Sequence, residues 1–217
     1  MNALGDPVLR LGIIGFGRLA QDYYVPALRR IRRPLEICIA DPLDRSRAAA
    51  AQALGSIPTY ADYREALNRE SLDAVLVAAP PSTHLANWRA AGANGLLVFM
   101  EKPFLLADEL PQVDPANPAW RNLMIDFNRR FWPTYRSLAE RVADGALGAV
   151  HHARFTLHVD AGRWSTVSDH LAHPREGGAL YDLGSQMLDL VHVIFSRQPD
   201  ALLARRSGNG GSTSGSR

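Results

Sequence analysis

Residues 11–20 read LGIIGFGRLA, and this stretch decides the fold. The apolar run that ends at Ile14 is typical of a buried parallel strand. The spacing Gly15-x-Gly17-x-x-Ala20 then predicts a tight turn into a helix, because Gly15 allows the turn and Ala20 allows close packing on the strand. Gly17 leaves no side chain where a pyrophosphate must approach, and the helix N-terminus offers its N–H groups to that charge.

A second apolar run, from Leu35 to Ala40, predicts the next strand. It ends at Asp41, about twenty residues beyond the glycine turn, where a carboxylate can accept hydrogen bonds from adenosine ribose hydroxyls. Strand, glycine turn, helix, strand and acid in this order indicate an NAD site. NADP could also bind, because Arg45 and Arg47 lie near the acid. The alternative is a glycine-containing turn in an unrelated α/β protein.

The composition narrows the class of protein. The chain has 217 residues, 47% of them hydrophobic, so it can bury a core. Its net charge of +2, from 24 basic and 22 acidic residues, argues against a nucleic-acid surface. No segment approaches the length of a membrane span and the N-terminus lacks the features of a secretory signal, so we expect a cytoplasmic protein without a membrane partner. The single cysteine, Cys38, lies in a strand pattern and is expected to be inert core.

Strand and helix patterns alternate through the first half of the chain, which predicts a parallel sheet with helices on both faces. Further strands are expected at 74–79, 96–100 and 122–127, with helices at 44–54, at 62–68 and from His84 onward. The second half predicts helices at 133–144 and 180–195, a longer strand at 149–159 and a loop at 160–178.

Six segments together resemble a known family. They read GFGRLAQDYYVPAL (15–28), ADPLDRSRAAAAQALG (40–55), LVAAPPSTH (76–84), EKP (101–103), FNRRF (127–131) and GGALYDLGSQMLDL (177–190). From about residue 8 to residue 200 the chain is similar to the glucose–fructose oxidoreductase, inositol dehydrogenase and rhizopine-catabolism (Gfo/Idh/MocA) family. The resemblance implies hydride transfer between a nicotinamide cofactor and a sugar, polyol or cyclitol carbinol.

The same resemblance implies an α/β architecture with two domains. We expect a Rossmann-type, doubly wound domain over residues 1–127, an incomplete α+β substrate domain over 128–204 and a flexible Gly/Ser-rich tail over 205–217. The family's substrate domain usually continues with a large antiparallel sheet, so the chain is expected to be truncated at its C-terminus. Family members commonly pair through that sheet, so a homo-oligomer is also possible.

Lys102, in the EKP segment, is the leading candidate for proton transfer. Hydride transfer from a carbinol needs a group that takes the hydroxyl proton, and Lys102 follows a strand at the edge where α/β proteins build their sites. Asp182, Gln186 and Asp189 share one helical face, which indicates a site wall, with a solvated face as the alternative. Asp182 could bind a substrate hydroxyl or tune Lys102. Gln186 stands where the family usually has histidine, and an amide cannot exchange protons near neutral pH.

Candidate cofactor contacts follow the strand ends. They are Gly15, Phe16, Gly17, Arg18, Leu19, Asp41, Ala79, Pro80, His84, Glu101 and Lys102. His84 could contact the cofactor or have a structural role, and Glu101 could orient Lys102, touch the cofactor or form a local ion pair. One of Arg129 and Arg130 is expected to contact substrate or cofactor and the other to lie on the surface. His170 and His173 lack partners at ligand spacing, so no metal site is expected.

Two other functions stay open from the sequence. The chain could be a nucleotide-binding remnant with little or no turnover, because little sheet would cover helix 180–195 and Gln186 removes a proton-transfer group. It could also be an interaction protein that uses an exposed sheet edge. Cofactor titration separates the interaction protein from the other two hypotheses. Turnover with a panel of polyols separates the active dehydrogenase from the nucleotide-binding remnant.

Overall fold

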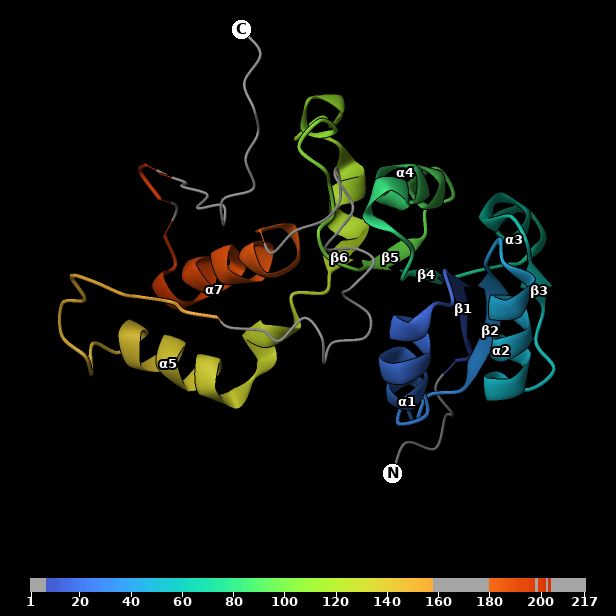
Figure 1. Ribbon diagram of the computed structural model, residues 1–217, viewed down its shortest axis with the longest axis horizontal. Coiled ribbons are helices and arrows are strands. Elements are labelled where there is room, and N and C mark those ends of the chain that lie inside the picture. The colour runs from blue at the N-terminus through green and yellow to red at the C-terminus, as the bar shows by residue number, and fades with distance from the viewer. Residues whose placement is uncertain (1–6, 158–179, 198, 202, 204–217) are drawn as a thin grey trace, which may run out of the picture.

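The computed structural model describes residues 7–157, 180–197, 199–201 and 203. Within these residues six parallel strands form one sheet in the order β3-β2-β1-β4-β5-β6 (Figure 1). The strands are β1 (Leu9–Ile14), β2 (Leu35–Ala40), β3 (Thr59–Tyr60), β4 (Ala74–Val77), β5 (Leu97–Met100) and β6 (Leu123–Ile125). The strand order reverses between β1 and β4, which is the topological switch point of a doubly wound Rossmann fold.

Helices cover both faces of this sheet. They are α1 (Val25–Leu28), α2 (Asp44–Leu54), α3 (Tyr63–Arg69) and α4 (His84–Ala93). A π-helical turn, η1 (Ala20–Tyr24), leads into α1. Figure 1 shows α1 and α2 on one side of the sheet and α3 and α4 on the other, as the alternation of strands and helices in the sequence predicts.

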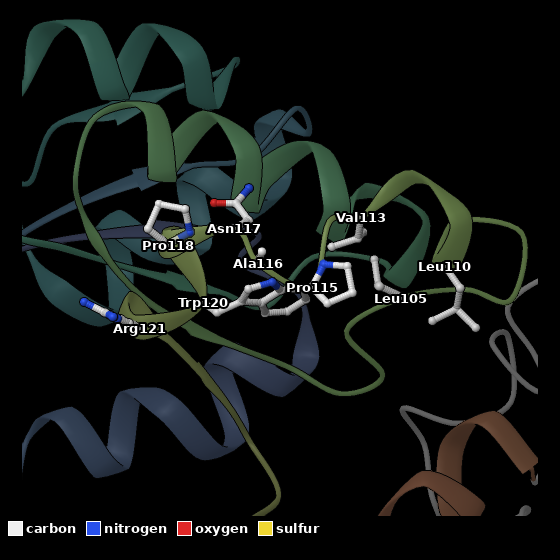
Figure 2. Close-up of a pocket in the computed structure, with 9 residues that line it drawn as sticks. All are labelled: Leu105, Leu110, Val113, Pro115, Ala116, Asn117, Pro118, Trp120 and Arg121. Carbon is white, nitrogen blue, oxygen red and sulfur yellow. The ribbon is translucent and has the colours of Figure 1, made fainter.

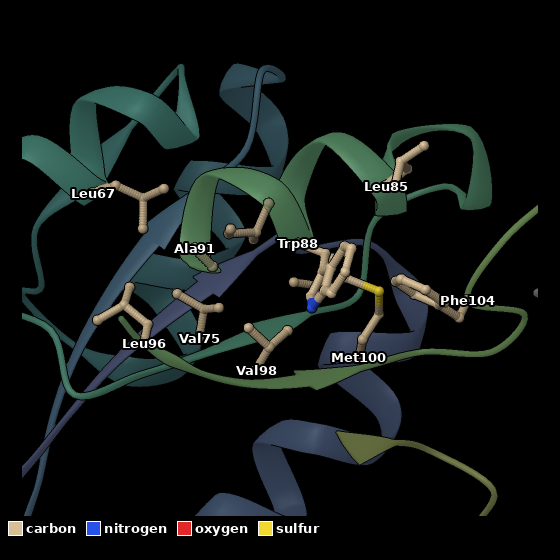
Figure 3. Packing of buried hydrophobic residues seen from close by; sticks show 11 residues of the cluster. Leu67, Val75, Leu85, Trp88, Ala91, Leu96, Val98, Met100 and Phe104 are labelled. Atoms are coloured by element: carbon tan, nitrogen blue, oxygen red, sulfur yellow. The ribbon is translucent and has the colours of Figure 1, made fainter. Parts of the chain in front are cut away.

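Adjacent residues of a strand enter opposite layers of the core. Ile13 packs in the layer with α1 and α2, whereas Ile14 packs in the layer with α3 and α4. Figure 3 shows the second layer, in which Val75 and Val98 of the sheet face Trp88 and Ala91 of α4. Because both faces are covered, the strands appear in the sequence as continuous apolar runs. Cys38 of β2 is also buried, and burial raises the pKa of its thiol to about 11, as expected of an unreactive core residue.

Local signals set the helix boundaries. α2 ends at Gly55, whose φ of 89° favours glycine. α3 begins at Asp62, whose Oδ1 accepts a hydrogen bond of 2.8 Å from the backbone N–H of Arg64. Both boundaries agree with the sequence. β3 was not predicted, because two residues are too short to show a periodic pattern.

The second half of the described chain is mainly helical. α5 (Pro133–Ala143) packs against α7 (Ser185–Phe195), which a π-helical turn, η6 (Leu180–Gly184), precedes. Both helices confirm the sequence pattern. The strand expected at 149–159 is wrong over residues 149–157, which are irregular, because no strand among the described residues pairs with them. The expected loop at 160–178 and tail at 205–217 lie outside the described residues.

The remaining elements of the described residues are short 3₁₀ helices. They are η2 (Pro81–Thr83), η3 (Leu110–Gln112), η4 (Pro118–Asn122) and η5 (Asn128–Phe131). Among the residues that the structure describes, no helix is both long and apolar enough to cross a membrane. The domain boundaries at residues 127 and 204 stay a prediction.

Among the residues that the structure describes, Trp88 of α4 is the largest fully buried side chain. Its ring packs against Phe104 and Trp120, with ring centroids 5.3 and 4.7 Å away. We expect Trp88→Ala to lower the free energy of unfolding by about 3–5 kcal/mol, because it leaves a cavity that this layer cannot fill. Urea unfolding measures the change. Trp132→Ala is the control, because Trp132 is 49% exposed, and its cost should be about 1 kcal/mol or less. Equal costs for the two variants would contradict the assignment of this core.

Candidate active site

The carboxyl ends of the parallel strands bring the predicted site residues to one edge of the sheet. The glycine turn follows β1, Asp41 follows β2, Ala79 follows β4 and Lys102 follows β5. The strand order reverses at this edge between β1 and β4, and ligands of doubly wound sheets bind beside such a reversal.

The two glycines of the turn have different roles. Gly15 has a φ of +87°, and a Cβ there would lie 2.7 Å from the carbonyl oxygen of Ala78, so the fold itself requires glycine. A Cβ at Gly17 would meet no heavy atom within 4 Å. The first N–H groups of the helix that begins at Arg18 have no acceptor within that helix. Open space beside N–H groups that have no acceptor within their helix is the geometry that a pyrophosphate requires.

Asp41 holds the glycine turn in place. It is buried, and its carboxylate accepts hydrogen bonds from the backbone N–H groups of Phe16, at 2.7 Å, and Leu43, at 2.9 Å. Arg47 donates to the backbone carbonyl oxygen of Asp41 at 2.6 Å. Each carboxylate oxygen keeps a second lone pair that can accept a hydrogen bond from a ribose hydroxyl. The contact between Asp41 and the ribose stays a prediction. The side chain of Phe16 lies in the core and can support the site only through its backbone.

His84 ties two strand ends together. It is fully buried, and its Nδ1 and Nε2 lie 2.8 and 2.9 Å from the carbonyl oxygens of Pro103 and Ala79. These contacts join the segment after β4 to the segment after β5, where the Lys102–Pro103 peptide bond is cis. The contacts are those of a structural residue, which is the second role that the sequence leaves open. Pro80 lies beside them as the N-cap of η2.

Lys102 joins the sheet edge to η6. Its ammonium forms an ion pair with the carboxylate of Asp182 and donates to the backbone carbonyl oxygen of Asp182 at 3.1 Å. The two side chains are 16% and 28% exposed, so the pair is largely shielded but still reachable. Lys102 is also the only lysine in the sequence. The structure therefore brings together two residues that the sequence analysis proposes as catalytic.

The other two polar residues of this helical face also meet partners. Arg129 donates from Nε to the side-chain oxygen of Gln186, and both side chains are buried. Arg130 forms an ion pair with Asp189 and donates to it from Nε at 3.1 Å. A solvated face is thus excluded for Gln186 and Asp189. Arg129 is buried, whereas the side chain of Arg130 stays 39% exposed, as expected of the surface member of this pair, although it also binds Asp189.

Glu101 contacts Tyr24, which in turn contacts Asp126, and the sequence analysis missed both of these residues. Its Oε1 lies 2.5 Å from the hydroxyl of Tyr24, which also lies 2.8 Å from Oδ2 of Asp126. Its Oε2 accepts a hydrogen bond of 3.1 Å from the backbone N–H of Lys102. Burial raises the pKa of Glu101 to about 7. The position of Asp126 at a strand end was the one available signal, and nothing in the sequence pointed to Tyr24.

A recess of about 570 Å³ lies elsewhere, over the segment between β5 and β6. Its lining residues, shown in Figure 2, are Leu105, Leu110, Val113, Pro115, Ala116, Asn117, Pro118, Trp120 and Arg121. None of them is a predicted site residue. His170, His173 and the two glycines at 177 and 178 lie outside the described residues, so the structure gives no geometry for them.

Two family models match the chain. One, described as an oxidoreductase family with an NAD-binding Rossmann fold, covers residues 9–115. The other, described as the GFO/IDH/MocA C-terminal domain, covers residues 135–212. Together they cover most of the chain. Lys102 lies in the part that matches the first model, and Asp182 lies in the part that matches the second.

Individual proteins agree with these models. An uncharacterized oxidoreductase, ORF334, from Rhizobium meliloti is 31% identical over 91% of this chain and 59% of its own length. The myo-inositol 2-dehydrogenase of Thermotoga maritima is 31% identical over 90% of this chain and 58% of its own length. The chain thus spans somewhat more than half the length of these relatives.

A solved structure shows the same fold. The scyllo-inositol dehydrogenase of Lactobacillus casei, with bound NAD(H) and scyllo-inositol, superposes with a TM-score of 0.73 at 22% identity, over 88% of this chain and 57% of that one.

Substitution of the two glycines separates cofactor binding from folding. We expect Gly17→Val to abolish dinucleotide binding and to leave the unfolding midpoint nearly unchanged, because the space beside Gly17 is open in the protein alone. Gly15→Ala should instead destabilise the protein, because its Cβ would collide with backbone. NADH fluorescence titration and thermal unfolding measure the two effects. Normal NADH binding by Gly17→Val would show that the phosphates bind elsewhere.

Proposed function

Because the chain belongs to the Gfo/Idh/MocA oxidoreductase family, we propose that it is an NAD-dependent dehydrogenase of a sugar, polyol or cyclitol carbinol. The observation that carries this proposal is the contact between Lys102 and Asp182 at the carboxyl edge of the sheet. A lysine that forms an ion pair with a carboxylate beside a dinucleotide cradle can exchange a proton with a substrate hydroxyl. The inositol dehydrogenases among the relatives support a cyclitol as the first substrate class to test.

The residues at the edge fit a bound dinucleotide. The open space at Gly17 and the helix N-terminus would receive the pyrophosphate, and Asp41 would accept from the ribose hydroxyls. When bound, the nicotinamide takes a hydride from the substrate carbon, or returns one to it. Pre-formed backbone donors and a fixed Asp41 lower the cost of ordering the site on binding.

Lys102 would move the proton that accompanies this hydride. In carbonyl reduction, the ammonium that pairs with Asp182 gives a proton from Nζ to the developing alkoxide. In carbinol oxidation, the neutral amine takes the hydroxyl proton at the same atom. The carboxylate of Asp182 stabilises the ammonium form and limits the positions of the long side chain.

Gln186 would contribute to substrate binding without exchanging protons. Its side-chain oxygen accepts from Arg129, and an amide neither gains nor loses a proton in this pH range. This favours one alternative function, a dinucleotide-binding protein with little turnover, if proton transfer in this site requires a second titratable group. The two functions differ in turnover and agree in cofactor binding.

NAD(H) should bind more tightly than NADP(H). A 2′-phosphate would come close to the negative charge of Asp41, and Arg47 is already engaged by the Asp41 carbonyl oxygen and by Asp44. Isothermal titration of both cofactors at one salt concentration measures the preference. Tighter binding of NADP(H) would show that Arg45 or Arg47 turns toward the phosphate and overrides Asp41.

Substitution of Lys102 tests the proposed proton transfer. We expect Lys102→Ala to lower turnover with NAD⁺ and a cyclitol by about 10²–10⁴-fold, while NADH affinity stays within a few-fold. Lys102→Arg is the matched variant, because it keeps a cation next to Asp182 that does not release its proton. It should be as inactive as Lys102→Ala. Substantial turnover by Lys102→Arg would show that this site needs a positive charge and that another group transfers the proton.

A further inference from the structure

The hydroxyl of Tyr24 lies between two carboxyl groups. Its oxygen is 2.5 Å from Oε1 of Glu101 and 2.8 Å from Oδ2 of Asp126. The three residues come from η1, from the end of β5 and from the end of β6, so they meet only in the folded protein. The ring of Tyr24 also packs edge-on against Phe99 of β5, which limits its movement.

Counting hydrogens shows what these two short contacts require. A tyrosine hydroxyl carries one hydrogen and can donate it to one carboxylate, and an ionised carboxylate can only accept. The second contact therefore needs its own hydrogen, which one carboxyl group must carry. We propose that Tyr24, Glu101 and Asp126 form a triad that holds one additional proton between its two carboxyl groups, and that this triad positions Lys102.

The surroundings favour Glu101 as the group that carries this proton. Burial raises the pKa of Glu101 to about 7, and the charge of Asp126 acts in the same direction, whereas the hydroxyl of Tyr24 and the ammonium of Lys102 act against it. Burial and the two carboxyl groups raise the pKa of Tyr24 far above its ordinary value, so Tyr24 stays a neutral hydroxyl. Among the described residues, the carboxylate of Asp182 also faces Lys102, from η6.

The triad reaches Lys102 through the backbone. Oε2 of Glu101 accepts from the N–H of Lys102 at 3.1 Å, so one carboxyl group holds both the hydroxyl of Tyr24 and the peptide of Lys102. A proton gained or lost by the triad changes the charge next to Lys102. The consequence for hydride transfer rests on the proposed function, whereas the proton held by the triad does not.

The only lysine of the chain gives this proton a direct reporter. Labelling with [¹⁵N]lysine yields a single backbone amide signal, that of Lys102, whose N–H donates to Glu101. We expect this signal to titrate with a midpoint near 7 in the protein without cofactor. Glu101→Gln should abolish the titration, because glutamine keeps a donor for Tyr24 but carries no titratable proton.

Two variants should move the midpoint in opposite directions. Tyr24→Phe removes a donor that stabilises the Glu101 carboxylate, so the midpoint should rise. Asp126→Asn removes a neighbouring negative charge, so the midpoint should fall toward 4.5.

Tyr23→Phe is the matched control, because Tyr23 is 55% exposed, and it should leave the midpoint unchanged. If Tyr24 and Asp126 had only a packing role, their substitutions would not shift the amide midpoint in opposite directions. If Tyr24→Phe fails to fold, Asp126→Asn and Glu101→Gln carry the test.

Turnover measured on the same samples separates this inference from the proposed function. With turnover, the pH profile of kcat should contain a step that moves with the amide midpoint in Tyr24→Phe and Asp126→Asn, while the KM for NAD⁺ of these two variants stays within a few-fold. If no turnover is detected, opposite shifts of the amide midpoint would still support the triad. The missing turnover would then count only against the proposed dehydrogenase activity. An amide midpoint between 4 and 5, a titration that persists in Glu101→Gln, or shifts in the same direction in both variants would overturn the triad.

Discussion

The ion pair between Lys102 and Asp182 is the interaction on which the site depends. It joins the end of β5 to a helical segment 80 residues later, and the same helical face continues with Gln186 and Asp189, each held by an arginine of η5. Three polar links thus fix this face against the sheet edge. Losing one partner of such a shielded pair leaves a charge without compensation, which costs more than the pair contributes when both partners are present.

The sequence predicts most of the sheet because its strands are covered on both faces. Continuous apolar runs, the glycine turn and the acid at Asp41 give the order of the elements and the edge at which they converge. It also predicts that Asp182, Gln186 and Asp189 share a face, because helical spacing is a local property. Their partners are not local. Arg129 and Arg130 lie more than fifty residues away, so the sequence names them as candidates without assigning either to this helix.

Other features of the site depend on segments that meet only in three dimensions. Tyr24 gives no signal in the sequence, since a tyrosine in the first helix is as compatible with the surface as with a carboxyl cluster. For His84 the sequence leaves a cofactor contact and a structural role open, and only the fold shows its burial and its two carbonyl partners. The strand expected at 149–159 fails over residues 149–157 because alternation along a chain predicts a strand only where a second strand can pair with it.

The proposed function requires that NAD⁺ bound at this edge of the sheet takes a hydride from a carbinol carbon while Lys102 takes the hydroxyl proton. The direct test is to incubate the chain with NAD⁺ and a cyclitol deuterated at its carbinol carbons and to measure deuterium at C4 of the nicotinamide by mass spectrometry and NMR. The account predicts NADH that carries one deuterium at C4, on a single face of the ring. Tight NAD⁺ binding without any deuterium transfer, across a panel of deuterated cyclitols and polyols, would contradict it.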